Sequence, residues 1–123
     1  MNIVLLEPEI PANTGNIGRT CVVTGSSLHL IRPLGFEISE KMLKRAGLDY
    51  WHKLDVSIYD SLEQFYEVHK DKRIWYVTTK AEKCYTQADY RPNDFLMFGK
   101  ETAGIPEEIL VANRSRCVRI PMI

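Results

Sequence analysis

The stretch FGKETAGIP, residues 98–106, directly follows the apolar run FLM at 95–97. An apolar run, a glycine-containing turn and then a proline predict a strand, a loop and the start of a helix. Gly99 and Gly104 allow a ligand to approach closely, so that exposed backbone N–H and C=O groups could read a nucleotide-like molecule. An ordinary strand-to-helix loop is the alternative, because glycines occur in loops of every kind. A Walker-type phosphate loop is excluded, since it needs a glycine where this chain has Asp94.

A second glycine-containing segment, NTGNIGRT at residues 13–20, follows the first predicted strand. Asn13 can cap a helix. Gly15 and Gly18 have no side chains, so one side of that helix can approach its neighbours closely. Arg19 lies on a nearby turn, from which it could point at a phosphate. The alternative is a helix packed closely through its glycines, with a solvated Arg19. The segment lacks the GxGxxG pattern of dinucleotide-binding folds, which argues against a nicotinamide enzyme.

Short apolar runs alternate with helical patterns along the chain. This alternation is typical of an α/β fold with a mostly parallel sheet and helices on both of its faces. Predicted helix caps are Asn13, Ser39 and either Asp60 or Ser61, and Gly25 is placed to end the first helix. The predicted strands are 3–6, 28–31, 56–59, 74–77, 95–98 and 117–120. The predicted helices are 13–24, a basic helix from 39, one from 60 or 61 to 69, and 106–111.

The composition fits one domain over residues 1–123, because 45% of the residues are hydrophobic and can form a core. Lys plus Arg and Asp plus Glu each number 16, so RNA binding would need a local basic patch rather than a global field. No leader or membrane-spanning pattern is found, and we expect a cytoplasmic protein without a membrane or metal partner. Three cysteines without a CxxC pair argue against a disulfide framework and a zinc site: Cys21, Cys84 and Cys117.

Four further phrases accompany the two motifs: LEPEIP at 6–11, RAGLDYW at 45–51, VTTK at 77–80 and RIPM at 119–122. Together the six segments resemble the SPOUT class of RNA methyltransferases. The strongest similarity is to the small branch that methylates the ribose 2′-hydroxyl of the wobble nucleotide in transfer RNA. The resemblance spans essentially the whole chain. It implies an enzyme that uses S-adenosyl-L-methionine, has a trefoil-knotted α/β fold, forms a homodimer and acts on the tRNA anticodon loop.

The resemblance also assigns roles to single residues. It implies catalytic roles for Asn13, Arg19 and Glu101, and cofactor contacts for Val77, Thr78, Gly99 and Ile120. The family casts Arg19 as the activating residue, but a guanidinium stays protonated at neutral pH. We therefore expect Arg19 to clamp a substrate phosphate and to stabilise developing oxyanion charge. Glu101 is expected to orient either Arg19 or the backbone of a turn.

Basic residues in and around RAGLDYW are expected to contact substrate phosphates, in particular Lys44 and Arg45. Lys80 is either a substrate contact beside the cofactor entrance or part of a solvated loop. Trp51 is favoured as a core residue, although it could stack on an unpaired anticodon base. His29 lies inside an apolar strand and is expected to be a hydrogen-bonded core residue rather than a ligand.

In the family, the RIPM segment is followed by a third motif and a final helix, which complete the knot and the cofactor pocket. This chain ends at Ile123, so we expect a chain truncated at its C-terminus, with an incomplete knot. Two other functions stay open at this point. One is a catalytically silent RNA-binding or dimerisation fragment of the same fold, and the other is a small nucleotide-binding α/β domain.

Overall fold

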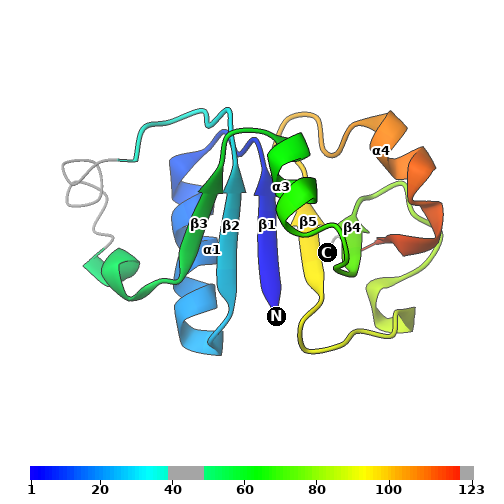
Figure 1. Cartoon of the computed structure of the whole chain (residues 1–123), viewed down its shortest axis with the longest axis horizontal. Coiled ribbons are helices and arrows are strands. Elements are labelled where there is room, and N and C mark those ends of the chain that lie inside the picture. The colour runs from blue at the N-terminus through cyan, green and yellow to red at the C-terminus, as the bar shows by residue number, and fades with distance from the viewer. Residues whose placement is uncertain (39–48, 120–123) are drawn as a thin grey trace.

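The computed structural model describes residues 1–38 and 49–119. Among these residues, six parallel strands form one sheet in the order β3-β2-β1-β5-β4-β6 (Figure 1). Because all strands run in one direction, the loops that follow them gather at a single edge, which we call the carboxyl edge. The strands are β1 Asn2–Leu6, β2 Ser27–Ile31, β3 Val56–Tyr59, β4 Ile74–Val77, β5 Phe95–Phe98 and β6 Cys117–Val118.

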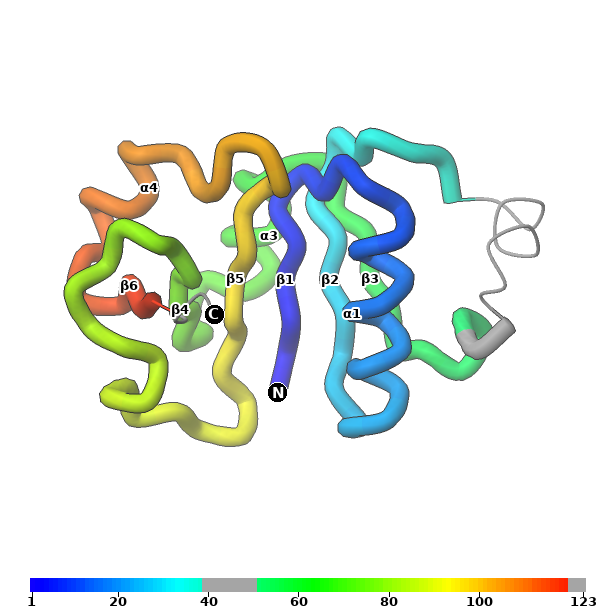
Figure 2. Tube along the Cα trace, turned by 180° about the vertical axis from the view of Figure 1, so that it is seen from behind, coloured from blue at the N-terminus to red at the C-terminus, as the bar shows by residue number. Residues whose placement is uncertain are grey.

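Helices flank the sheet on both faces, so the strands can be apolar at nearly every position. The described α-helices are α1 Pro11–Thr24, α3 Leu62–Val68 and α4 Glu107–Ala112. Short 3-10 helices cover Asp49–Lys53 (η1), Tyr85–Gln87 (η2) and Arg114–Arg116 (η3). Figure 2 shows α1 lying over β2 and β3 on the face opposite α3.

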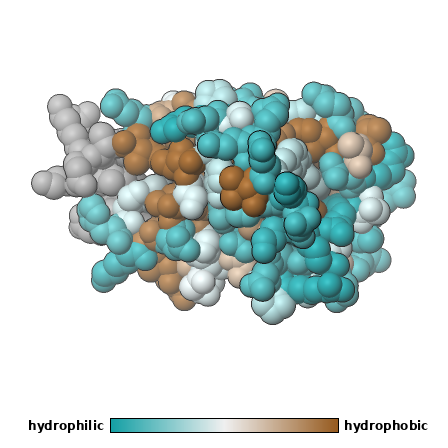
Figure 3. Space-filling view, in the orientation of Figure 1, coloured by the Kyte–Doolittle hydropathy of each residue, from teal (hydrophilic) through white to brown (hydrophobic). Residues whose placement is uncertain are grey.

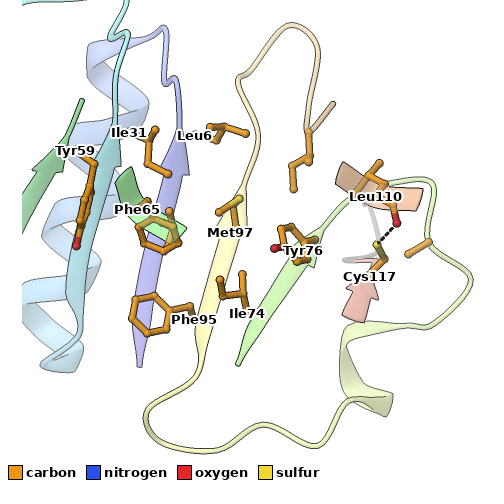
Figure 4. Close-up of a cluster of buried hydrophobic side chains, with 13 residues drawn as sticks. Leu6, Ile31, Tyr59, Phe65, Ile74, Tyr76, Phe95, Met97, Leu110 and Cys117 are labelled. Atoms are coloured by element: carbon orange, nitrogen blue, oxygen red, sulfur yellow. Dashed lines mark hydrogen bonds between the residues drawn. The ribbon is translucent and has the colours of Figure 1, made fainter. Parts of the chain in front are cut away.

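Each face of the sheet has its own core. On the face that carries α3, side chains from all six strands form one cluster, in which the fully buried Phe65 packs against Tyr59 and Phe95 (Figure 4). Beneath α1, the core contains Leu5, Leu28, Leu30 and Cys21. The alternation of side chains along each strand supplies both cores, because neighbouring residues point to opposite faces.

The predicted α/β class and parallel sheet are confirmed, and so are the predicted strands up to residue 98. Gly25 ends α1 as expected, with a φ of 70°, a conformation that glycine adopts at little cost. Ser61, rather than Asp60, caps α3: its Oγ accepts the N–H of Gln64 at 3.1 Å. The final strand is described as Cys117–Val118, and Ile120 lies outside the described residues.

Two predicted helix starts are wrong. Ile10 occupies the cap position of α1, and Asn13 lies inside the first turn. The reason is Pro11, whose fixed φ and missing N–H suit the first helical position, so the helix starts two residues before Asn13. Pro106 is the cap of α4, which begins at Glu107. The basic helix predicted from Ser39 lies outside the described residues.

Two residues expected in the core are buried there. Trp51 is 8% exposed and His29 is 6% exposed. His29 Nδ1 lies 2.7 Å from the Tyr59 hydroxyl, and its Nε2 lies 3.1 Å from Oδ1 of Asn2. The same hydroxyl lies 2.8 Å from Nε2 of His69. His29 is therefore the hydrogen-bonded core residue that the sequence predicts.

The hydropathy of the surface varies across the face of the sheet that carries α3. Figure 3 shows hydrophilic side chains around β4 and the loop through η2, whereas apolar side chains gather toward β2 and β3. None of the described helices combines the length and the apolar character needed to cross a bilayer. The described residues also hold no group of three or more His, Cys, Asp or Glu side chains arranged for a metal ion.

Candidate active site at the carboxyl edge

The carboxyl edge brings together three strand ends that are distant in sequence. Val77 of β4 pairs with Phe98 of β5 and with Val118 of β6. The next residue along the chain, Thr78, donates its N–H to the carbonyl of Val118 at 2.9 Å. The predicted cofactor residues Val77, Thr78 and Gly99 therefore lie at neighbouring strand ends, where ligands of parallel α/β sheets usually bind.

Two glutamates join the loop after β5 to the loop after β1. Oε2 of Glu101 accepts the backbone N–H groups of Glu9 and Ile10, at 2.8 and 2.9 Å. In return, Oε1 of Glu9 accepts the N–H and the hydroxyl of Thr102, at 3.0 and 2.7 Å. The hydrogen bonds from Thr102 lower the pKa of Glu9 below its ordinary value, so the carboxylate is ionised at neutral pH.

The consequence for α1 is a cap supplied from another loop. Ile10, at the cap position, has no side chain that could accept a hydrogen bond, and Oε2 of Glu101, 91 residues away, accepts the N–H of Ile10 itself, as a glutamate at the third helical position does in a capping box. A carboxylate at a helix N-terminus also interacts favourably with the helix dipole. Of the two roles expected for Glu101, the structure shows the contact with a turn backbone.

Gly99 is required by the shape of its own loop. The Gly104 N–H donates to the carbonyl of Lys100 at 2.8 Å, which closes a tight turn in which Gly104 has a φ of +69°. A Cβ on Gly99 would overlap the backbone of Gly104 and Ile105. The loop itself fills the position that a Cβ on Gly99 would take, and the cofactor contact expected of Gly99 stays a prediction.

Asn13 and Arg19 project from different sides of α1. Both are exposed, whereas Gly15 and Gly18 between them are buried. Six residues at about 100° each place the two side chains roughly 240° apart around the helix axis. The glycines therefore face the protein interior, as expected for a helix that packs closely through its glycines, and Arg19 lies at the surface.

A cavity of about 440 Å³ opens beside β4 and α4. Thr78, Lys80 and the buried Cys117 contribute to its lining, together with Leu110 and Glu107. Nζ of Lys80 lies 3.0 Å from Oε2 of Glu107, and both side chains are well exposed. The cavity has the size of a small-molecule site and a mixed apolar and polar lining, which fits a nucleoside-like cofactor.

The predicted site residues are only partly brought together. Thr78 and Lys80 line the cavity, while Val77 and Gly99 end neighbouring strands at the same edge. Ile120, Lys44 and Arg45 lie outside the described residues. Sequence reasoning missed Glu9 and Thr102. An acidic residue two positions before a proline at a helix start is the signal that could have indicated Glu9.

Comparisons with known proteins agree with this architecture. The model of the SpoU rRNA Methylase family matches residues 1–123. A relative from Listeria innocua is 54% identical over 98% of this chain and 73% of its own length. The Escherichia coli tRNA (cytidine(34)-2′-O)-methyltransferase is 45% identical over 100% of this chain and 79% of its own length. A crystal structure of a protein from Bacillus anthracis has a TM-score of 0.93 and 53% identity, covering 99% of this chain and 79% of that one.

A more distant structure shares the fold alone. The SpoU methyltransferase AviRb from Streptomyces viridochromogenes, solved in complex with AdoMet, has a TM-score of 0.79 and 18% identity, covering 100% of this chain and 49% of that one. The family match extends over the whole chain, and the parallel sheet is the one seen in these methyltransferase structures. This chain belongs to the SpoU methylase family.

Proposed function

We propose that this protein transfers the methyl group of S-adenosyl-L-methionine to the ribose 2′-hydroxyl of nucleotide 34 in tRNA. The observation that carries the proposal is the near-complete coverage of this chain by its match to the tRNA (cytidine(34)-2′-O)-methyltransferase of E. coli. The grouping of Val77, Thr78 and Gly99 at one sheet edge supports it, because this edge is where a nucleoside-like cofactor would bind.

The cofactor would be held by Val77, Thr78, Gly99 and Ile120. S-adenosyl-L-methionine supplies an electrophilic methyl group on a sulfonium. The ribose oxygen would form a bond to that carbon as the carbon–sulfur bond breaks, the thioether S-adenosylhomocysteine would leave, and the hydroxyl proton would pass to water. The main contribution of the protein is positioning, which can lower the barrier by roughly 7–11 kcal/mol when the reactants are well aligned.

Arg19 would act on the RNA. An exposed guanidinium can grip a phosphate with two parallel hydrogen bonds and can stabilise negative charge as it develops on the ribose oxygen. Lys44, Arg45 and Lys80 would contact further phosphates of the anticodon loop. Glu101 and Asn13 would support this arrangement, Glu101 by fixing the loop that precedes α1.

We also propose that the enzyme is a homodimer. The exposed side of α1 includes Val23, which is 81% exposed, and Ile10, before the helix, is 41% exposed. Val23 is an exposed apolar side chain on α1 that a second copy could cover. Sedimentation at micromolar concentration would test the stoichiometry independently of the chemistry.

The test of the activity is to incubate the protein with radiolabelled S-adenosyl-L-methionine and bulk tRNA, and then to map the labelled nucleotide. We expect label on the 2′-oxygen of nucleotide 34, and loss of label in Arg19→Ala. RNA binding without cofactor binding would instead indicate a silent RNA-binding module. Tight binding of a free nucleotide without RNA binding would indicate a small-molecule site.

A further inference from the structure

A second cavity lies at the opposite edge of the sheet, which we call the amino edge. It measures about 330 Å³ and is formed by the end of α3, the start of β4 and the segment that leads into β6. Its lining includes Lys70, Lys72 and Arg116, and no aspartate or glutamate among the described residues. An excess of positive charge around one hollow is unusual for a protein whose net charge is zero.

Within the part of the chain that the structure describes, these three cations are not neutralised by neighbouring carboxylates. The ion pairs found there join Arg32 to Asp60, Arg73 to Asp94, Lys80 to Glu107 and Lys100 to Glu7. None of these pairs includes a cation of the amino-edge cavity. Arg116 is held in place by an aromatic partner instead, since its guanidinium carbon lies 5.7 Å from the ring centre of Trp75.

The wall of the cavity also offers a hydroxyl proton. The hydroxyls of Tyr66 and Tyr76 lie 2.8 Å apart, and both side chains line the cavity. Burial raises the pKa of both tyrosines, so both stay protonated at neutral pH. One of the two hydroxyl protons forms the hydrogen bond between the tyrosines. The other hydroxyl proton can be donated to an acceptor outside the pair.

Three cations with a hydroxyl donor, and no carboxylate in the lining, match the chemistry of a phosphate group. The position of the cavity argues for a polymer. β4 has four residues, so its two ends are separated by roughly 13 Å at about 3.3 Å per residue. At about 3.4 Å per stacked nucleotide, that separation equals several nucleotides. A nucleic-acid strand of a few nucleotides can therefore place one phosphate in this cavity and a ribose at the carboxyl edge.

We propose that the amino-edge cavity binds a backbone phosphate of the RNA whose ribose is methylated at the carboxyl edge. The inference rests on the proposed function in taking RNA as the ligand. Contacts to phosphate orient a nucleic acid without reading its sequence, so this site would fix the register of the substrate. It would contribute to binding and leave the chemical step unchanged.

The experiment measures tRNA affinity as a function of salt for Lys70→Gln, Lys72→Gln and the double variant. Both lysines are exposed, so the variants should fold, which circular dichroism would check. Arg32→Gln is the matched control, since it also removes one exposed positive charge, from an ion pair elsewhere on the surface. We expect each lysine variant to raise Kd about three- to tenfold. We also expect the log–log salt slope to become shallower by about 0.7–0.9 for each phosphate that is no longer neutralised.

Affinity for S-adenosyl-L-methionine and kcat at saturating tRNA should stay at the wild-type values. If the lysine variants bind tRNA like Arg32→Gln, the inference is wrong. It is also wrong if inorganic phosphate binds the wild type and loses affinity in the variants while tRNA does not, because the cavity would then serve a free anion. If the wild type binds tRNA with these effects but transfers no methyl group, the proposed function fails and the phosphate site stands.

Discussion

Two carboxylates at opposite edges of the sheet organise their surroundings in different ways. At the amino edge, Asp94 is 2% exposed and accepts hydrogen bonds from Nε1 of Trp75 at 2.8 Å, from the Arg91 N–H at 2.9 Å and from Nε of Arg73 at 3.0 Å. At the carboxyl edge, Glu101 is exposed and accepts two backbone N–H groups from the start of α1.

The difference indicates which edge supports the fold and which can move with a ligand. Burial alone would raise the pKa of Asp94, but the hydrogen bonds from Trp75, Arg91 and Arg73 outweigh it and hold that pKa below its ordinary value. The buried carboxylate ties the start of β4 to the loop before β5. An exposed one competes with water, so its loop can open at low cost, as loops at ligand sites generally do.

The largest effect is expected from Asp94→Ala. The substitution removes the acceptor of Nε of Arg73 and of the indole N–H of Trp75, while Nη2 of Arg73 keeps the carbonyl of Asp89. Removing one partner of a buried ion pair typically costs about 3–5 kcal/mol. Urea unfolding would measure it, with Asp60→Ala as the control, because the Asp60 side chain is 77% exposed and its ion pair should contribute about 1 kcal/mol or less. Equal losses in the two variants would remove the contrast between buried and exposed carboxylates.

The buried histidine gives the next largest effect, through pH. Burial, with a smaller contribution from His69, lowers the pKa of His29 to about 4, so the folded protein keeps this ring neutral while the unfolded chain protonates it near 6.5. The unfolded state therefore binds more protons between these values, and stability falls as the pH drops from 6.5 toward 4. The loss should reach about 3 kcal/mol at 1.36 kcal/mol per pKa unit. Urea midpoints between about pH 4.5 and 7.5 would show it, and a slope that persists unchanged in His29→Gln would assign it to other groups.

Gly99→Ala should have a smaller effect, confined to the carboxyl edge. The added Cβ meets the backbone of Gly104, so the loop has to shift, at a cost of about 1–3 kcal/mol. Gly104→Ala is the matched control: its Cβ meets open space, but the φ of +69° should cost about 1–2 kcal/mol. We expect Gly99→Ala to weaken S-adenosyl-L-methionine binding more than Gly104→Ala does, as measured by calorimetry. The opposite order would place the ligand nearer Gly104.

The strands were predictable because most are apolar runs covered on both faces, as in Phe95–Phe98 and Ile74–Val77. The contacts between distant loops were not. Glu9 and Thr102 are 93 residues apart and meet only because β1 lies beside β5. No local pattern encodes that strand order. The role of Asp94 was not predictable either, since two of its donors, Arg73 and Trp75, come from a segment about 20 residues earlier in the chain.

Substitutions of Glu101 are expected to have the smallest effect on stability. They distinguish most clearly between a structural and a catalytic role for this residue. Both backbone N–H groups bond to the same oxygen, Oε2, so Glu101→Gln can keep an acceptor in place while it removes the charge. Glu101→Ala removes both, and loss of a helix cap costs about 1 kcal/mol. If Glu101 only holds the start of α1, Gln should retain most of kcat/KM and Ala should lose much of it.

If the charge itself acts on Arg19 or on the RNA, Gln and Ala should lose methyl transfer equally, with little change in stability for Gln. Single-turnover rates and urea midpoints for the two variants separate these outcomes. A loss of stability in Glu101→Ala as large as that in Asp94→Ala would mean that both edges support the fold equally. The exposed carboxylate would then be as costly to remove as the buried one, which its access to water argues against.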